Sequence, residues 1–398
     1  MRTTTFLLKA VKSIFPSFEF TWLGEEMEQN LPLEMDFRHE AANAARCVKD
    51  FSDLKKTPLV VPDVLWAKKR VMVMEFIQGG RVDDLDYLAR HKIDRNLVSR
   101  QIAEICSRMI YITGFFHADL SATTDFVECL RHGGNLLIRP AQPGSRSPYN
   151  FEIVLLDHGL YFDLPSDLRV NYAKFWLSLM ARPSPSVEAE RRKYAKLVAN
   201  IDDEHYPLFQ AAITGRAALE GASLSGEEAD AKGGARRGSM LDLGENTKEE
   251  KRRMRNAMVM QEGLMEALFE ILRNVPRRML MLFKVNDLNR CVLSLVALSS
   301  GFTDRIVGSL CSALDISLQT THSPARIFLI IAQYCNLAIR LDDLAHIPPL
   351  SFYNRLHSWA RYQTWKWKLT IWTVGADWKT WLDRMRGRER GELVLQLA

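Results

Sequence analysis

The 398-residue sequence predicts an α+β fold, and three observations lead to that prediction. Long stretches carry apolar residues at helical spacing. Short runs rich in β-branched residues lie between them in the first half of the chain. Turns rich in Gly, Pro or basic residues separate those short runs. Beyond Pro165 the pattern is mostly helical.

Composition is that of an ordinary soluble globular protein, with 47% hydrophobic and 25% charged residues. The net charge of +5 comes without any basic run, so we expect no nucleic-acid partner. Six scattered cysteines show no CxxC spacing, which indicates a reducing compartment rather than a disulfide scaffold. No apolar run reaches the roughly 18 residues that a membrane span needs.

The first part of the chain is predicted to pair helices with a β-hairpin. The opening "MRTTTFLLKAVKSIF" is interpreted as an amphipathic helix, with a targeting peptide as the alternative. A helical pattern begins at Asp36. Two β-rich runs, 60–66 and 71–76, flank the basic turn 68–70 and predict the hairpin, and the pair 79–80, both Gly, ends its second strand.

The middle of the chain carries a long helix and a second hairpin. Asp94 is placed to cap the helix, whose apolar stripe leads to His117-Ala118-Asp119. Short apolar runs at 136–138 and 153–156 surround a turn rich in Pro, Gly and Ser. They predict a second hairpin, and "LLDHGLYFDLP" follows it directly.

Three regions are predicted from these patterns: 1–80, 81–300 and 301–398. The stretch 221–251 inside the second is rich in Gly, Ser and charge, so we expect a disordered insertion. Six of the nine Trp lie in the last region. They predict a helical pair that packs in a core or docks a partner, and the alternative is an aromatic belt at a membrane surface, helped by Lys366 and Lys368.

The order of the motifs is that of a protein kinase. A helix with an acid, a hairpin, a long helix, His-x-Asp, an Asn before a strand and Asp-x-Gly after the next strand follow one another. Phosphoryl transfer needs a carboxylate at the substrate hydroxyl, and an amide oxygen and a second carboxylate on Mg²⁺. Asp119 and His117 are the candidate catalytic residues, and Asn135 and Asp157 are the candidate metal ligands.

The segment "VMVMEFIQGG" resembles the hinge of ordinary kinases. That resemblance would make Met74 the gatekeeper and turn the backbone of Glu75 and Ile77 toward adenine. A plain edge strand is the alternative interpretation.

Three segments together resemble the UbiB-type, or aarF-domain, atypical kinases: "NLPLEMDFRHEAANA", "FFHAD…HGGNLLI" and "IVLLDHGLYFDLP". Glu34 and Asp36 match the family's ExD pair, and Glu40 matches the helix Glu that pairs with a strand Lys. The resemblance implies a kinase-like two-lobed fold, here with an incomplete small N-lobe, a mostly helical C-lobe and a helical C-terminal extension. It also implies ATP or ADP binding with Mg²⁺.

"LLDHGLY" resembles the mitochondrial branch of the family in particular. The resemblance therefore implies a role in lipid or coenzyme Q homeostasis, with a lipid or quinone-related small molecule as a partner. It further implies peripheral association with the inner mitochondrial membrane. Members of the family are not generally protein kinases.

The front of the kinase pattern is missing from this sequence. It has no KxGQ motif, no nucleotide loop ahead of the ExD pair and no strand Lys, since Lys9 and Lys12 lie in a helical pattern. Glu40 would then lack its ion-pair partner, so we interpret the chain as N-terminally truncated and expect weak nucleotide binding with little or no transfer. An active ATPase or small-molecule kinase and a non-catalytic helical scaffold are the two alternatives.

The spacing within the catalytic loop also departs from the pattern. Sixteen positions separate Asp119 from Asn135, where ordinary kinases have five. The longer loop costs only about 1 kcal/mol more to close. Removing 121–131 leaves "HADLHGGNLLI" and restores the usual spacing, so we interpret those residues as a gene-model error, with a genuine loop as the alternative.

Overall fold

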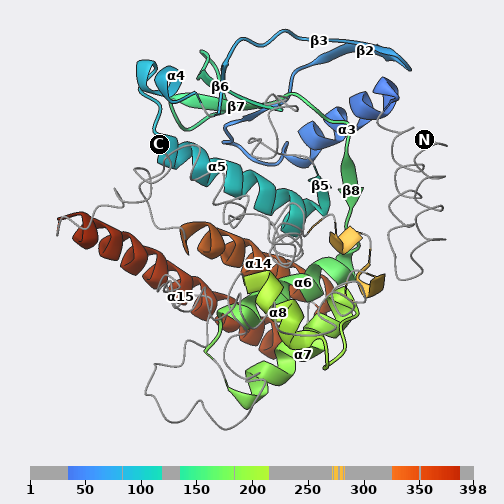
Figure 1. Cartoon of the computed structure of the whole chain (residues 1–398), viewed down its shortest axis with the longest axis vertical. Helices are drawn as coiled ribbons and strands as arrows, with labels where there is room; N and C mark the ends of the chain where they lie inside the picture. The colour runs from blue at the N-terminus through green and yellow to red at the C-terminus, as the bar shows by residue number, and fades with distance from the viewer. Residues whose placement is uncertain are drawn as a thin grey trace, which may run out of the picture.

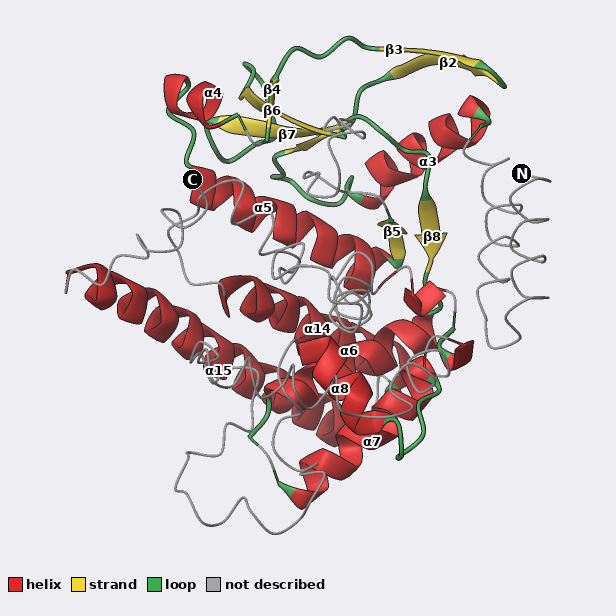
Figure 2. Cartoon of the chain, viewed as in Figure 1, coloured by secondary structure: helices red, strands yellow, loops and turns green. Residues whose placement is uncertain are grey.

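The α+β prediction is confirmed by the computed structural model, in which most strands lie toward one end and helices make up the other end (Figures 1 and 2). The residues that the structure describes are 35–82, 84–118, 135–182, 184–214, 271, 273–276, 278–280, 282, 325–348 and 351–385. The opening helix and the insertion 221–251 predicted from the sequence lie outside them.

Helix α3 (Phe37–Asp50) begins where the sequence predicts. Asp36 is its N-cap, and the Asp36 side chain accepts a hydrogen bond from the backbone N–H of Arg38 at 3.1 Å. The side chains of Ala44 and Cys47 are buried on its inner face. Arg146 holds the end of the helix, because its guanidinium donates to the carbonyl oxygen of Phe51 at 2.8 Å.

The first predicted hairpin is confirmed, with a later start. Strands β2 (Val64–Lys68) and β3 (Val71–Met74) pair antiparallel. Val60 was predicted in this hairpin and instead belongs to β1 (Leu59–Val60), because Pro62 interrupts the run and cannot donate to a ladder. A lone two-stranded hairpin is marginal, and here α3 packs against it, with Phe37 N donating to Lys69 O at 3.2 Å.

The second predicted hairpin is also confirmed and lies in a four-stranded sheet of order β1-β7-β6-β4. Strands β6 (Leu136–Pro140) and β7 (Phe151–Leu155) pair antiparallel, and β1 joins β7 in parallel. The pair 79–80 does follow the end of β3, but Gly80 itself lies in β4 (Gly80–Arg81), which pairs with β6. A Cβ at Gly80 would lie 2.4 Å from the Tyr87 ring, so the close approach requires glycine.

Helices α4 (Leu85–Arg90) and α5 (Arg95–Arg108) follow, and Asp94 caps α5 as predicted, its side chain accepting from Asn96 N at 2.8 Å. A π-helical turn over Met109–Thr113 continues α5. It delivers the chain to β5 (Phe115–His117), which pairs with β8 (Tyr161–Asp163). The end of α5 is thereby fixed next to the predicted catalytic motif.

The rest of the described chain is helical, as predicted. Helix α14 lies at its centre and packs on α5, α6 and α15 (Figure 1). One continuous core joins α5, the β6–β7 hairpin, α6 and α14. Among the described helices, none is both long enough and apolar enough to cross a membrane. These helices are α6 (Ser166–Met180), α7 (Pro185–Ala199), α8 (Tyr206–Thr214), α14 (Ala325–His346) and α15 (Phe352–Met385).

Candidate functional site

The two candidate metal ligands lie at the same end of the β6–β7 hairpin. Asn135 directly precedes β6, and Asp157 comes two residues after the last residue of β7. Leu136 is paired with Leu155, and the backbone N–H of Leu156 donates to the carbonyl oxygen of Asn135 at 3.0 Å. The antiparallel register therefore brings the two candidate ligands together across 22 positions of sequence.

Their chemistry fits Mg²⁺. A carboxylate and an amide oxygen are hard ligands, and Mg²⁺ in nucleotide sites uses one or two carboxylates together with phosphate oxygens and water. The carboxylate of Asp157 is held by a turn in which its Oδ1 accepts from Gly159 N at 2.8 Å. Within the described ranges, no three His, Cys, Asp or Glu side chains gather into a metal-binding group.

His117 ties β5 to the Asp157 loop. Its ring is completely buried, and its Nε2 lies 2.9 Å from the carbonyl oxygen of Asp157. The next residue, Ala118, donates its N–H to the carbonyl oxygen of Leu160 at 3.0 Å. Asp119 follows directly but lies outside the described residues, so its role as the catalytic residue stays a prediction.

Two side chains of helix α3 form hydrogen bonds with the backbone of His158 in the same loop. The Oε1 of Glu40 accepts a hydrogen bond from His158 N at 3.2 Å. The Nδ2 of Asn43 donates to His158 O at 2.9 Å. Both side chains lie on one face of the helix, three residues apart, so together they fix the two peptide units that flank His158, the residue after Asp157.

Glu40 therefore has a backbone partner where the family pattern expects a lysine. Burial raises the pKa of its carboxyl, and the nearby charge of Asp157 raises it further, while the hydrogen bond from His158 N lowers it. Glu40 is half-buried rather than an exposed surface acid. In the part of the chain that the structure describes, no lysine or arginine forms an ion pair with it.

His158 fills the middle of the loop as a neutral ring. Burial, with a smaller contribution from the neighbouring His117, lowers its pKa to about 4. Its Nε2 lies 3.1 Å from the carbonyl oxygen of Leu155, and its Nδ1 lies 2.9 Å from the Tyr161 hydroxyl. The carbonyl can only accept, so Nε2 carries the proton and Nδ1 accepts from the hydroxyl of Tyr161.

The hinge-like segment lies on the other hairpin. Met74 ends β3, and the N–H of Glu75 donates to the carbonyl oxygen of Asp63 at 2.8 Å. That N–H is therefore used within the protein, while the Ile77 side chain is buried and the Phe76 side chain is almost fully exposed. Among the described residues, no hydrogen bond joins this segment to the Asp157 loop, so its adenine role stays a prediction.

The ExD acids are brought to the start of α3. Asp36 caps the helix and also forms an ion pair with Arg38, whose Nη2 lies 2.7 Å from its Oδ2. The hydrogen bonds from Arg38 lower the pKa of the Asp36 carboxyl to about 2. Glu34 lies outside the described residues.

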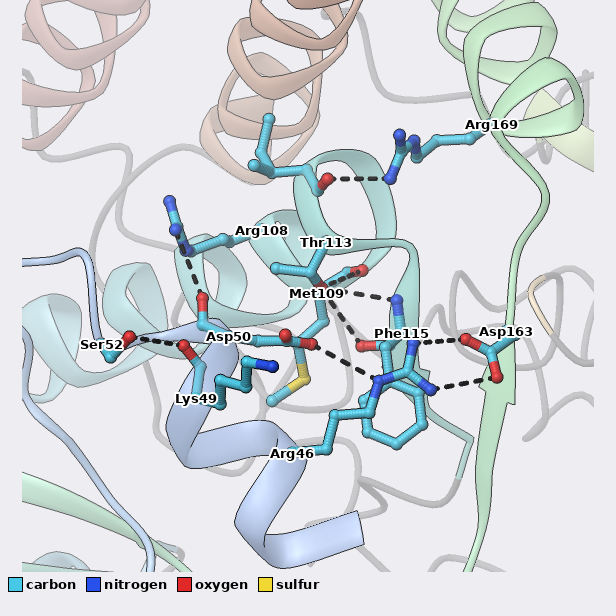
Figure 3. Close-up of polar contacts among 11 residues, drawn as sticks. Arg46, Lys49, Asp50, Ser52, Arg108, Met109, Thr113, Phe115, Asp163 and Arg169 are labelled. Carbon is cyan, nitrogen blue, oxygen red and sulfur yellow. Dashed lines mark hydrogen bonds and ion pairs between the residues drawn. The ribbon is translucent and has the colours of Figure 1, made fainter.

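Sequence reasoning missed two residues of α3 that support the site. These residues are Asn43 and Arg46. The guanidinium of Arg46 lies over the Phe115 ring, 3.8 Å from its centroid, and it donates hydrogen bonds to both carboxylate oxygens of Asp163 (Figure 3). The spacing Glu40, Asn43, Arg46 was the available signal, because residues three apart share a helix face. The arrangement can hold Mg²⁺ and phosphates against a loop that α3 keeps in place.

Comparisons with known proteins identify the family of the chain. Residues 1–190 match the ABC1 atypical kinase-like domain. The chain is 36% identical over 341 residues to the ABC1 family protein MCP2 homolog of Schizosaccharomyces pombe, covering 86% of this chain and 52% of that protein. It is also 36% identical to AarF domain-containing protein kinase 1 of Gallus gallus, covering 72% of this chain and 48% of that protein.

The chain spans about half the length of the curated relatives it matches. The solved structure of an Rv3197–erythromycin complex from Mycobacterium tuberculosis is 20% identical, with a TM-score of 0.33 over 44% of this chain and 39% of that one. That likeness is too low to say more about the fold. The domain match and the curated relatives together confirm the resemblance seen in the sequence motifs: the chain belongs to the UbiB/aarF, or ABC1, family of atypical kinase-like proteins.

Proposed function

We propose that this chain binds ADP or ATP with Mg²⁺ at the end of the β6–β7 hairpin, as an atypical kinase-like protein. An ABC1 kinase-like domain is consistent with binding of a nucleotide and a metal. The single observation that carries the proposal is the arrangement around Asp157. The backbone N–H of Leu156, the residue before Asp157, donates to the carbonyl oxygen of Asn135, and α3 holds the backbone of His158, the residue after Asp157, through Glu40 and Asn43.

Each candidate residue then has a role. Asn135 and Asp157 would hold Mg²⁺ against the phosphates, and Asp119 would orient or deprotonate the group that attacks. His117 would act beside Asp119, and its ring would also position the loop through the carbonyl oxygen of Asp157. The backbone around Met74, Glu75 and Ile77 would face adenine.

The ExD acids would limit access to the site, and the three predicted regions would each form a separate part of the protein. Glu34 and Asp36 would lie at the start of α3, beside the place where a substrate approaches. Residues 1–80 would form a small incomplete lobe, 81–300 a mostly helical lobe, and 301–398 a helical extension.

Nucleotide affinity should be weak and phosphoryl transfer slow or absent in this 398-residue chain. Kinase sites use a lysine that pairs with the helix Glu and neutralises phosphate charge. Glu40 instead accepts a backbone hydrogen bond from His158, and its carboxylate is close enough to Asp157 to raise its own pKa. Among the described residues, no lysine or arginine is paired with Glu40, so Mg²⁺ would offset the negative charge that these acids present to the phosphates.

The biological setting follows from the family alone. A role in lipid or coenzyme Q homeostasis, a mitochondrial location, peripheral contact with the inner membrane and a lipid or quinone-related ligand all belong to this proposal. They rest on the resemblance of "LLDHGLY" to the mitochondrial branch of the family.

Calorimetric titration of the 398-residue chain with Mg·ATP and Mg·ADP, together with an assay of phosphate release, tests the proposed function. We expect a dissociation constant well above the micromolar range and no turnover above background. A sub-micromolar constant would contradict the expected weakness, and sustained phosphate release would favour an active ATPase instead.

A further inference from the structure

Helix α15 is apolar on two opposite faces. Its inner face, marked by the buried Ser358, Leu369 and Ala376, packs against α14. Half a turn away, a second set of large apolar side chains lies in solvent at helical spacing. These are Phe352, Leu356, Trp367, Ile371, Val374 and Trp378, which we call the outer face.

The exposure of the outer face is large for such side chains. Trp367 is 67% exposed, Ile371 64% and Trp378 65%. Helix α15 runs along the outside of the helical end of the molecule, with α14 between it and α5 (Figure 1). At about 1.5 Å per residue, its 34 residues form a strip about 50 Å long. Several large apolar side chains exposed along one face of a helix indicate an interaction site.

The positive charge of α15 indicates that an anionic partner covers that strip. The helix holds six lysines and arginines against two aspartates, so four of the five net positive charges of the chain lie in this one helix. One of the aspartates, Asp377, is already paired with Arg326 at 3.2 Å. Lys366 and Lys368 project on either side of Trp367, at the edges of the outer face, and both are exposed.

We propose that the outer face of α15 lies flat on a membrane surface containing anionic lipids. Tryptophan is enriched at membrane–water interfaces, and helices with one apolar face and basic edges bind there in the plane of the surface. Each lysine or arginine near an anionic surface adds to the attraction. A second copy of the chain is a poorer fit, because it would bring the same positive edges against each other.

This surface deepens the membrane part of the proposed function and is independent of its nucleotide part. Its test therefore uses the full chain without nucleotide. Vesicles of equal parts phosphatidylcholine and phosphatidylglycerol are compared with vesicles of phosphatidylcholine alone, and bound protein is measured by co-sedimentation. We expect binding to the anionic vesicles, weakened by high salt.

The matched pair of variants is Ile371→Asp and Leu197→Asp. Both replace an exposed aliphatic side chain by the same charge, since Ile371 is 64% exposed on the outer face and Leu197 is 52% exposed on α7. We expect about tenfold or greater loss of vesicle binding for Ile371→Asp. Leu197→Asp should bind as the unaltered chain does. Trp378→Asp is the second outer-face variant, used if Ile371→Asp fails to fold.

Three results would overturn the proposal. The first is no binding to anionic vesicles. The second is equal binding by Ile371→Asp and Leu197→Asp. The third is a dimer, seen by light scattering without vesicles, that only the outer-face variants dissociate, because a second copy would then cover the strip. The strength of nucleotide binding does not affect any of these three measurements, because all of them are made without nucleotide.

Discussion

At the scale of single residues, the loop after β7 is held by groups whose protonation is set by burial. His158 is neutral because a charged ring could not be hydrated there. Glu40 is the only acid of α3 that reaches the loop, and it accepts a backbone hydrogen bond. Each of these two residues gives the protein a distinct dependence on pH.

His158→Phe should remove part of the acid sensitivity of the fold. The folded pKa of about 4 lies below the ordinary histidine pKa of about 6.5, so the unfolded chain takes up a proton first as the pH falls. The contribution of the neutral His158 ring to the free energy of unfolding is fully present above about pH 6.5. It decreases by about 3 kcal/mol as the pH falls to about 4. In denaturant unfolding, the free-energy difference between the unaltered chain and the variant should shrink by about that amount between pH 7 and pH 4. A constant difference would contradict the assignment.

Glu40→Gln should stabilise the protein at neutral pH. The pKa of Glu40 is raised in the folded state, so its stabilising contribution is present at acid pH and is lost as the pH rises through that pKa. Glutamine keeps an oxygen that can accept from His158 N and removes the charge. The free energy of unfolding should therefore exceed that of the unaltered chain at pH 7 and match it at pH 4.

Glu40→Ala is the control for the hydrogen bond itself. It removes the acceptor and leaves a largely buried N–H without a partner, which should cost about 1–3 kcal/mol at either pH. If Gln and Ala behave alike, the hydrogen bond between Glu40 and His158 does not stabilise the loop.

At the scale of secondary-structure elements, α3 is joined to the β5–β8 pair by an arginine (Figure 3). The guanidinium of Arg46 stacks on Phe115 and forms two hydrogen bonds with Asp163. Arg108 and Arg146 hold the other end of α3, through Asp53 and through the carbonyl oxygen of Phe51. The position of α3, and so of Glu40, depends on these contacts.

Arg46→Met should destabilise the protein by about 1–2 kcal/mol, because it loses a cation–π contact and a mostly exposed ion pair. Asp163→Asn keeps the stacking on Phe115 and should cost at most about 1 kcal/mol. Denaturant unfolding of both variants gives the comparison. Equal losses would mean that the stacking contributes nothing.

Sequence patterns found most of these elements and missed how some of them join. The caps at Asp36 and Asp94 act within three residues, and both were predicted because capping is local. The place of Val60 in β1 was not predicted, because its partner Val154 is 94 positions away. The same is true of Asn43, whose contact with His158 spans 115 positions. Sequence motifs named Asn135, Asp157 and Glu40, while the supporting residues needed the fold.

At the scale of the whole molecule, α14 connects the strand-bearing end to the Trp-rich helix. It packs on α5, which leads into the catalytic motif, and on α15. The helical pair predicted for the last region is therefore present as α14 and α15, and the partly buried Trp365 and Trp372 pack against the core. Helix α15 has one face for this core and one for solvent.

Leu369→Ala and Ile371→Ala separate the two faces of α15. Leu369 is fully buried against α14, so its truncation should cost about 2–4 kcal/mol of unfolding free energy. Ile371, two positions along, should tolerate the change within about 0.5 kcal/mol. Thermal or denaturant unfolding measures both. Equal effects would contradict the assignment of the inner face.

The metal dependence of ADP binding tests the central claim most directly. Calorimetric titrations with and without Mg²⁺ are compared for the unaltered chain, Asp157→Asn and the control Asp202→Asn, which changes an exposed aspartate on the α7–α8 connection. We predict weak binding that requires Mg²⁺, retained in Asp202→Asn and reduced at least about tenfold in Asp157→Asn. Binding that is indifferent to Mg²⁺ and unchanged in Asp157→Asn would contradict the account.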